Sequence, residues 1–305
     1  MLQRLQLLEA AVDNAGDAIS ITEATPGQGD RLTYVNDSFC QLTGYSKQEL
    51  LGQPLEMLNG PETDLGELEK LLEAVRQGRS YRAEVIAYRK DGSSYYHEIS
   101  YTPFRDATGT VTHFIGISRD VTERRRMHDR LAHQALHDAL TELPNRVLLA
   151  DRLRQAILSA HRNKHGLAVM VIDLDGFKDV NDTHGHATGD QVLHQLGPRL
   201  RGTLRSVDTV ARIGGDEFAI VLPAAGSAAD ALNIGKKLRA AVRRPFEIEG
   251  TQVRIDASIG IALFPKHGDN AEALLDRADS AMYEAKRRRL GCLLYEALKP
   301  TSDGS

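Results

Sequence analysis

The chain has 305 residues, of which 41% are hydrophobic and 26% charged, the composition of an ordinary globular protein. At roughly 150 residues per domain, this length predicts two domains. The net charge of −4 argues against nucleic-acid binding and against disorder. The only two cysteines, Cys40 and Cys292, exclude a disulfide framework and lack the paired spacing of a zinc site.

Membrane and export signals are absent from the pattern of the sequence. No apolar run reaches the roughly 18 residues that span a bilayer. The first 16 residues mix polar with apolar types, whereas a signal peptide needs an unbroken apolar stretch. We therefore expect a cytoplasmic protein that has no membrane partner.

The first part of the chain predicts a small domain over residues 17–122, preceded by a short amphipathic helix within residues 1–16. Short apolar runs are separated there by turn residues, which is typical of an antiparallel sheet. The expected elements are a hairpin (18–21 with 32–35), two short helices (36–44 and 46–51) and a meander (81–89, 94–103 and 111–119).

Residues 123–138 contain no turn residues and predict a linker helix. Met127, Leu131 and Ala135 fall on one face of that helix. We interpret it as a signalling helix that pairs with a second copy, so that the protein is a homodimer through the first domain and this helix.

A second domain is expected over residues 139–298, because helices and strands alternate from there on. The helices are predicted at 151–161, 189–204, 228–242 and 271–288, the strands at 167–173 and 253–263, and a hairpin at 210–222. The strand at 167–173 is almost wholly apolar, as in a buried strand. This pattern predicts an α/β sandwich with helices packed on a central sheet.

Acidic residues mark two points of this second domain. Asp173 and Asp175 end the buried strand, and the motif GGDEF over Gly214–Phe218 forms the hairpin turn. Carboxylates together with phosphate oxygens are the ligands that Mg²⁺ prefers, and paired glycines let the backbone approach a bulky anion. Groups suited to phosphate or to a purine edge follow the strand: Lys178, Asn181 and Asp190. The set predicts metal-assisted nucleotidyl transfer.

The same motifs resemble the diguanylate cyclases of the GGDEF family. GGDEF is preceded by DLDGFKDVNDTHGHATGD (Asp173–Asp190) and DALTELPNR (Asp138–Arg146), and the resemblance extends to Tyr295. It implies a palm-like α/β domain related to nucleotidyl cyclases. It also implies an enzyme that condenses two GTP into cyclic di-GMP and releases two pyrophosphates.

The resemblance assigns roles to individual positions. It implies that Mg²⁺ or Mn²⁺ is held by Asp173, the Leu174 carbonyl, Asp216 and Glu217. Asp216 and Glu217 would also be catalytic, with Asp216 the base for the ribose 3′-hydroxyl. The implied substrate contacts are Lys178 to phosphate, Asn181 and Asp190 to guanine, and Gly214, Gly215 and Lys286 around the nucleotide.

Two further positions bear on regulation and on affinity. The sequence RSVD (Arg205–Asp208) matches the family's product-inhibition site, in which Arg205 and Asp208 hold cyclic di-GMP and Lys237 adds a second basic contact. Leu290 stands where the family has an arginine four residues after Lys286. This departure leaves open a catalytically weak domain that only binds GTP or cyclic di-GMP. In many relatives a phosphodiesterase domain follows, so the chain is alternatively a fragment.

The first domain resembles a PAS domain through YVNDSFCQLTGYSKQELLGQP (34–54), YRKDGSSYYHEIS (88–100) and THFIGISRDVTERR (112–125). LNGPETD (58–64) is similar to the LOV photosensors, but Leu55 replaces the cysteine that their chemistry needs. The flavin-contacting positions are also changed, to Gln53, Glu56, Ala87, His97 and Ser118. We therefore expect no flavin and an unknown ligand. Haem ligation by His97 or His113, or a purely dimerising role, are the alternatives.

The overall expectation is an α+β chain. It comprises a PAS fold with an antiparallel five-stranded sheet and helices, a linker helix, and an α/β palm-like domain.

Overall fold

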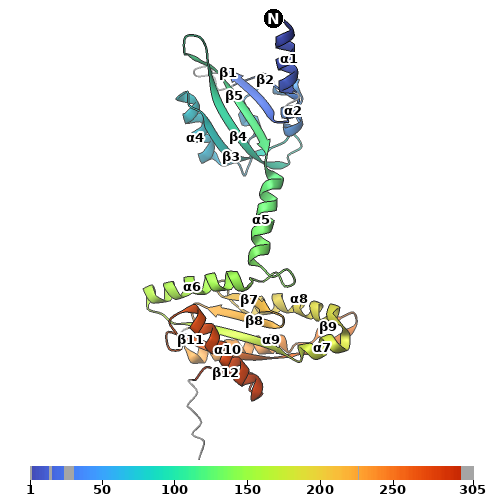
Figure 1. Cartoon of the computed structure of the whole chain (residues 1–305), viewed down its shortest axis with the longest axis vertical. Helices are drawn as coiled ribbons and strands as arrows, with labels where there is room; N and C mark the ends of the chain where they lie inside the picture. The colour runs from blue at the N-terminus through green and yellow to red at the C-terminus, as the bar shows by residue number, and fades with distance from the viewer. Residues whose placement is uncertain (1, 14–15, 24–30, 226, 297–305) are drawn as a thin grey trace, which may run out of the picture. The chain divides into compact units, whose positions relative to one another are not determined.

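The computed structural model describes residues 2–13, 16–23, 31–225 and 227–296. It divides into two compact units, residues 1–130 and 131–305 (Figure 1). The expected N-terminal helix is present as α1 (Leu2–Asp13), and the predicted hairpin loop at 25–30 lies outside the described residues. None of the helices in the described ranges combines the length and the apolar character needed to cross a membrane.

The first unit is built on one antiparallel sheet of five strands in the order β2-β1-β5-β4-β3. The strands are β1 (Ala18–Glu23), β2 (Arg31–Val35), β3 (Tyr81–Tyr88), β4 (Ser94–Arg105) and β5 (Val111–Asp120). The hairpin and the meander expected from the turn residues are both confirmed. Alternate residues of the strands are buried, so one face of the sheet carries the core of this unit.

The helices of the first unit cover that face. They are α2 (Asp37–Thr43), α3 (Lys47–Leu50), the 3₁₀ helix η1 (Leu55–Leu58) and α4 (Leu65–Arg76). Asn36 and Ser46 are the N-terminal caps of α2 and α3. The sequence analysis did not predict η1 or α4. The N-terminus of α4 is fixed by Asp64, which accepts a hydrogen bond from the backbone N–H of Glu67 at 3.0 Å.

Asn36 joins three segments at the edge of this unit. Its side-chain oxygen accepts hydrogen bonds from the backbone N–H groups of Ile19 (2.8 Å) and Phe39 (3.0 Å). Its amide nitrogen donates to the carbonyls of Val12 (2.9 Å) and Asp17 (3.0 Å). Because Asn36 is fully buried, these four bonds satisfy the side chain and fix the end of α1 against β1 and α2.

The linker segment is helical over α5 (Thr122–Leu136), two residues shorter at its end than predicted. Its first residue is held by the sheet, because Thr122 Oγ1 accepts a hydrogen bond from the backbone N–H of Tyr96 at 2.8 Å. The helix ends before Asp138, whose carboxylate accepts from the backbone N–H of Thr141 (2.9 Å) and closes a turn.

The second unit has a five-stranded sheet in the order β12-β11-β6-β8-β7, antiparallel except for the β11–β12 pair. Its strands are β6 (Leu167–Asp175), β7 (Thr209–Gly214), β8 (Glu217–Leu222), β11 (Asp256–Phe264) and β12 (Cys292–Leu294). Its helices are α6 (Arg146–Asn163), α7 (Phe177–His184), α8 (His186–Thr203), α9 (Ala228–Val242) and α10 (Ala271–Arg287).

Two hydrophobic clusters lie on the two faces of this sheet. One packs α7, α8 and α9 against the face that carries Met170 and Ile220, and the other packs α6 and α10 against the face that carries Val169 and Val221. The strand β6 is buried on both sides, which explains its unbroken apolar sequence. The predicted α/β sandwich is confirmed.

Several elements of the second unit differ from the expectation. The predicted strand at 253–263 is Asp256–Phe264, and Val253 belongs to a separate hairpin of β9 (Phe246–Ile248) and β10 (Thr251–Val253). Helix α7 was not predicted. Helix α6 begins five residues earlier than expected, because Asn145 caps it by accepting hydrogen bonds from the N–H groups of Val147 and Leu148.

Candidate active site

The acidic ends of β6 and β8 lie side by side at one edge of the second unit. Asp173 and Glu217 are opposite each other in the antiparallel register of these strands. The backbone N–H of Leu174 donates to the carbonyl of Asp216 at 3.3 Å, which joins the end of β6 to the hairpin turn. The structure therefore brings Asp173 and Leu174 together with Asp216 and Glu217, a pair that lies more than 40 residues later in the sequence.

The hairpin turn is held from one side by Arg212 on β7. Its Nε donates to the carbonyl of Gly215 at 2.9 Å, and its Nη1 donates to the carboxylate of Asp138 at 2.9 and 3.1 Å. Gly215 has a φ of +24°, a conformation that L side chains rarely adopt. Burial raises the pKa of Asp138, but hydrogen bonds from Thr141 and Arg212 outweigh it and lower that pKa below its ordinary value. Sequence reasoning missed this contact, although Asp138 and Arg212 both lie in or beside the motifs it singled out.

Lys286 reaches the same edge from α10. Its Nζ donates to Oδ1 of Asp173 at 2.5 Å. Burial opposes the charged form of Lys286, but the hydrogen bond to Asp173 and the neighbouring carboxylates Asp175 and Asp216 raise its pKa. The ammonium is therefore a fixed positive charge among carboxylates.

Asp175 is held apart from this group by β11. Both of its carboxylate oxygens accept from the Ser258 hydroxyl at 3.0 Å. Burial raises the pKa of Asp175, and the Ser258 hydrogen bond offsets only part of that. Asp173 is thus the carboxylate of β6 that faces Lys286, and Asp175 is bound to the sheet.

The residues expected to contact guanine lie on α7 and α8. Asn181 packs directly over Gly189, where an added Cβ would be 1.9 Å from the Asn181 Oδ1. Asp190 is the next residue of α8 and is exposed, and Lys178 is exposed in the first turn of α7. Asn181 and Asp190 are therefore neighbours, while Lys178 lies close to the end of β6 through the short Gly176 turn.

The donors at the strand ends suit a hard divalent cation, since the carboxylates of Asp173, Asp216 and Glu217 and the carbonyl of Leu174 are all oxygen ligands. Among the described residues, no three or more His, Cys, Asp or Glu side chains form a cluster that could hold a metal ion.

The RSVD segment forms a turn before β7, in which the backbone N–H of Arg205 donates to Oδ2 of Asp208 at 2.9 Å. Arg152 and Arg201 line the same cleft. Lys237 lies elsewhere. It is in the second half of α9, which packs on β11 and β12 at the opposite edge of the sheet from β7.

Leu290 is 45% exposed just beyond α10. Of the arginines beside it, Arg287 donates to Glu284 through Nε (2.9 Å) and Nη2 (2.7 Å), and Arg288 lies 3.8 Å from the same carboxylate. Glu284 therefore binds the two arginines closest to Lys286.

Comparison with known proteins identifies both domains. The model of the family "Diguanylate cyclase, GGDEF domain" matches residues 135–291, and a PAS domain model matches residues 17–123. Both resemblances inferred from the sequence motifs are confirmed.

Two curated relatives represent the matches. Diguanylate cyclase TpbB of Pseudomonas aeruginosa is 49% identical over 162 residues, which cover 53% of this chain and 37% of TpbB. The probable diguanylate cyclase DgcE of Escherichia coli is 32% identical over 289 residues, which cover 94% of this chain and 26% of DgcE. The chain thus spans little more than a third of the length of TpbB and about a quarter of that of DgcE.

Solved structures agree with these matches. The GGDEF domain of TpbB aligns with a TM-score of 0.51 and 48% identity, covering 52% of this chain and 94% of that one. The coiled coil and GGDEF domain of DgcB from Caulobacter crescentus, in complex with c-di-GMP, aligns with a TM-score of 0.51 and 31% identity, covering 56% and 92%. The chain belongs to the GGDEF-domain diguanylate cyclase family and carries a PAS domain ahead of that domain.

Proposed function

We propose that the second domain is a diguanylate cyclase that condenses two GTP into cyclic di-GMP with release of two pyrophosphates. The observation that carries this proposal is the pairing of Asp173 with Glu217 at the strand ends, beside the Gly214–Gly215 turn. Family membership and the named activity of relatives such as TpbB support it. Because GTP is a cytoplasmic nucleotide, the reaction is placed in the cytoplasm.

We propose that Asp173, the Leu174 carbonyl, Asp216 and Glu217 hold Mg²⁺ or Mn²⁺. When bound, the cation neutralises triphosphate charge and stabilises the pyrophosphate as it leaves. In the structure the Asp173 carboxylate is bound by Lys286. We infer that Lys286 exchanges this partner for the triphosphate when the site is loaded, because both the cation and the ammonium need the same carboxylate.

The remaining groups bind and orient the nucleotide. Asp216 accepts the proton of the ribose 3′-hydroxyl, and Glu217 assists beside it. Gly214 and Gly215 let backbone N–H groups approach phosphate, and Lys178 adds a positive charge. The guanine base is bound by two other residues. Asn181 and Asp190 contact guanine, since a carboxylate accepts from both N1–H and the exocyclic amine of guanine.

Two active sites must face each other, because the product contains two phosphodiester bonds. A single site holds one GTP and therefore has no acceptor hydroxyl from a second GTP. We therefore propose a homodimer formed through the PAS domain and α5. Every residue of α5 from Glu123 to Ala135 is exposed, and isolated helices of about 12–15 residues are marginal in water. A second copy of α5 packed on Met127 and Leu131 supplies the missing contacts.

The activity is tested by incubating the purified chain with GTP and Mg²⁺ and measuring cyclic di-GMP. We expect turnover in wild type, and a loss of at least about 100-fold in Asp216→Ala, the size of a removed general base. Asp276→Ala removes an exposed carboxylate from α10 and should leave the rate unchanged. Absence of product from wild type at high protein concentration would contradict the proposal.

The alternative is a receptor that binds GTP or cyclic di-GMP without turnover. Leu290 is the observation that favours it, since an arginine is expected at this position. The same assay separates the two functions when a binding measurement is added. Saturable GTP binding with no product would establish the receptor.

We further propose that Arg205 and Asp208 form a product-inhibition site. Arg152 and Arg201 line the same cleft, and guanidinium groups bind phosphate and guanine acceptors in bidentate fashion. Lys237 lies at the far edge of the sheet, so it would contact product only from another domain copy.

This inhibition is tested in progress curves. Arg205→Ala should raise the plateau of product while leaving the initial rate unchanged, and added cyclic di-GMP should inhibit wild type without competing with GTP. Arg162→Ala, at the exposed end of α6, is the control. Identical curves and an identical response to added product in wild type and Arg205→Ala would show that Arg205 has no inhibitory role.

A further inference from the structure

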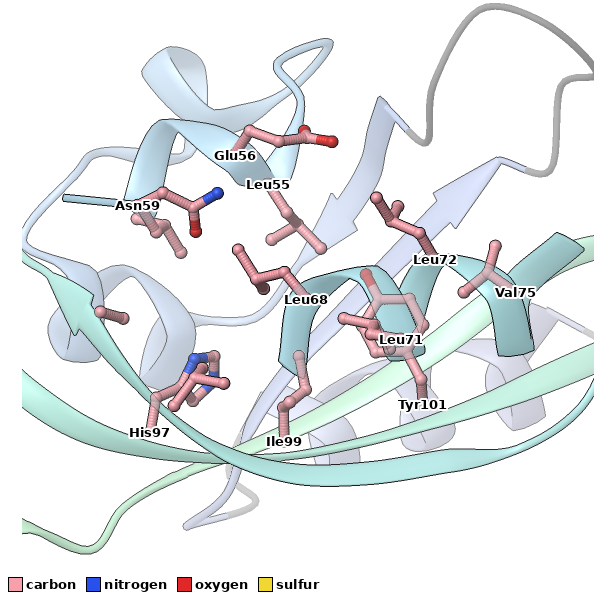
Figure 2. A pocket seen from close by; sticks show the side chains of 13 residues that line it. Leu55, Glu56, Asn59, Leu68, Leu71, Leu72, Val75, His97, Ile99 and Tyr101 are labelled. Carbon is pink, nitrogen blue, oxygen red and sulfur yellow. The ribbon is translucent and has the colours of Figure 1, made fainter. Parts of the chain in front are cut away.

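The two units place their charged side chains differently. The pocket of the first unit, between η1, α4 and the sheet, is lined mostly by aliphatic side chains such as Leu68, Leu71 and Ile99 (Figure 2). In the second unit, charged groups gather at one edge of the sheet, where β6 ends and β8 and β11 begin. One cation of that edge, Arg239 of α9, has no role in the nucleotide site proposed above.

Arg239 is bound to the first residue of β11. Its Nε donates to Oδ1 of Asp256 and its Nη2 donates to Oδ2, each at 2.8 Å. Asp256 is opposite Asp175 in the antiparallel register of β11 and β6. The hydrogen bond to Asp256 and the charges of Asp256 and Asp175 outweigh burial and raise the pKa of Arg239. Arg239 is therefore a permanent cation beside the strand that carries Asp173.

The guanidinium also lies against the loop between α10 and β12. A Cβ added at Gly291 would overlap Nη1, Cζ and Nε of Arg239, so the guanidinium occupies the space that a side chain there would take. On the neighbouring strand, Lys286 binds the carboxylate of Asp173. Two cations therefore bind carboxylates at the ends of adjacent strands, at the same edge of the sheet.

A bound triphosphate needs cations at this edge. It carries more negative charge than one divalent ion neutralises, and the proposed metal ligands Asp173, Asp216 and Glu217 are themselves negative. A planar guanidinium donates two parallel hydrogen bonds to a pair of oxygens, whether they belong to a carboxylate or to a phosphate. The two donors that bind Asp256 are therefore suited to two oxygens of a phosphate group.

Arg239 can leave Asp256 without creating an unpaired buried charge. The side chains of Arg239 and Asp256 are 29% and 34% exposed. Asp256 also has two other partners, because the backbone N–H of Ala257 donates to its Oδ1 at 2.8 Å and Nε of Arg243 lies 3.7 Å from its Oδ2. Breaking a buried ion pair is strongly destabilising because one charge is left uncompensated, and the exposure and the remaining partners of Asp256 avoid that cost.

We propose that Arg239 binds the terminal phosphates of GTP and exchanges Asp256 for them when the nucleotide enters. The assignment rests on the proposed cyclase function and on the proposed triphosphate site beside Lys286. Asp256 competes with the substrate, because it holds the guanidinium while the site is empty. The motifs that carry the family resemblance do not include Arg239.

Inorganic pyrophosphate with Mg²⁺ is the probe, because it reproduces the terminal phosphates of GTP. Calorimetry on the full chain measures its binding, and GMP is the comparison ligand that lacks those phosphates. We expect Arg239→Met to weaken pyrophosphate binding about tenfold, the size of a lost charge-assisted hydrogen bond, and to leave GMP binding unchanged. Arg244→Met removes an exposed arginine just beyond α9. It is the matched control and should bind both ligands as wild type does.

Asp256→Asn separates the exchange from a structural role of the ion pair. Asparagine retains the shape of the side chain but not its charge, so it holds the guanidinium less tightly. Pyrophosphate binding should therefore strengthen about fivefold, the difference between a charged and a neutral hydrogen bond. In the Arg239→Met background the same change should give a clearly smaller gain, because no guanidinium is left to release. Circular dichroism checks the fold of each variant.

The proposal is overturned if wild type binds no pyrophosphate, if Arg239→Met binds it as tightly as wild type, or if GMP binding falls in the same proportion. It is also overturned if Asp256→Asn gives no gain, or gives an equal gain in both backgrounds, which would reflect only the removed negative charge. Synthesis of cyclic di-GMP by wild type is measured separately. Failure of the cyclase function is thereby distinguished from failure of the role assigned to Arg239.

Discussion

Gly189 and Asn181 are in contact because residue 189 has no side chain. A Cβ there would be 1.9 Å from Oδ1 of Asn181 and 3.2 Å from the ring of Phe177. Asn181 Oδ1 is the far end of a flexible side chain, so a larger residue at 189 would turn the amide away instead of unfolding the helix. The glycine thus fixes the direction of a side chain proposed to contact guanine.

This contact predicts the effect of Gly189→Ala. The KM for GTP should rise about tenfold, as expected for one lost hydrogen bond, with kcat little changed. Gly202→Ala, in the same helix with no atom within 4 Å of the new Cβ, is the matched control and should leave the KM unchanged. Steady-state kinetics on both variants check this.

A double-mutant cycle makes the test specific. If Gly189→Ala acts by displacing Asn181, the double variant Gly189→Ala/Asn181→Ala should be no worse than Asn181→Ala alone. Additive increases in KM would show instead that the alanine disturbs α8 by another route.

Arg212 connects three elements around the GGDEF turn. It binds the Gly215 carbonyl in the turn and the carboxylate of Asp138, two residues after the end of α5. The Asn145 Nδ2 donates to the Ala135 carbonyl at 2.8 Å, so the end of α5 is also tied to the start of α6. The segment that follows α5 is therefore joined to the turn through one guanidinium group.

Arg212→Met should destabilise the second unit by about 2 kcal/mol at pH 7, the loss of hydrogen bonds to a charged group, and should lower kcat. Arg212→Lys retains the charge but not the planar guanidinium that donates to both partners. Its effects on stability and on kcat should therefore be intermediate. Arg146→Met is the control, since the side-chain hydrogen bond of Arg146 among the described residues is a single long one, from Nε to the Ile213 carbonyl at 3.4 Å. Urea unfolding and initial rates measure both effects.

The stability difference has a defined pH dependence. The pKa of Asp138 is lower in the folded state than in the unfolded state. The ionised carboxylate therefore stabilises the fold above the unfolded pKa of about 3.9, and this stabilisation is lost as the pH falls through the folded pKa. The gap in unfolding free energy between wild type and Arg212→Met should therefore shrink below about pH 4. A gap that stayed constant to pH 2 would show that Arg212 does not act through the Asp138 carboxylate.

The sequence predicted elements with strong periodicity or turn chemistry and missed those without them. Helix α9 was predicted with its exact ends, and in the structure Ser227 caps it by accepting a hydrogen bond from the N–H of Asp230. Helix α4 was missed because its leucines lie among charged residues and remain partly exposed. The β9–β10 hairpin was missed because its strands have only three residues each.

The candidate site was predictable only through its motifs. Asp173 and Asp216 were found as acidic pairs at a strand end and a turn, which the β6–β8 register then joins. The Lys286–Asp173 contact spans 113 positions along the chain, and no local pattern encodes a contact of that separation. The same holds for Arg212 and Asp138, 74 positions apart.

Across the whole chain, α5 is the covalent connection between the PAS domain and the domain that contains the acidic turn. Its residues 123–135 are all exposed, and Met127 and Leu131 expose 58% and 59% of their surface. These two residues are four positions apart and therefore on one side of the helix. An exposed apolar pair on one face of a mostly polar helix is the pattern of a seam between two copies.

The double variant Met127→Glu/Leu131→Glu tests this seam. Four carboxylates would face one another across a paired α5, and like charges oppose association. If two GTP-loaded domains must meet, specific activity should depend on protein concentration, and the variant should need about tenfold more protein to reach half its maximum, while its maximum is retained. Asp129→Lys changes a charge on the opposite side of α5 and should behave as wild type. Initial rates measured over a dilution series, together with sedimentation at each concentration, decide the matter. A wild-type specific activity independent of concentration in a sedimenting monomer would exclude catalysis by a dimer, and an unshifted curve in the double variant would place the contact elsewhere than on Met127 and Leu131.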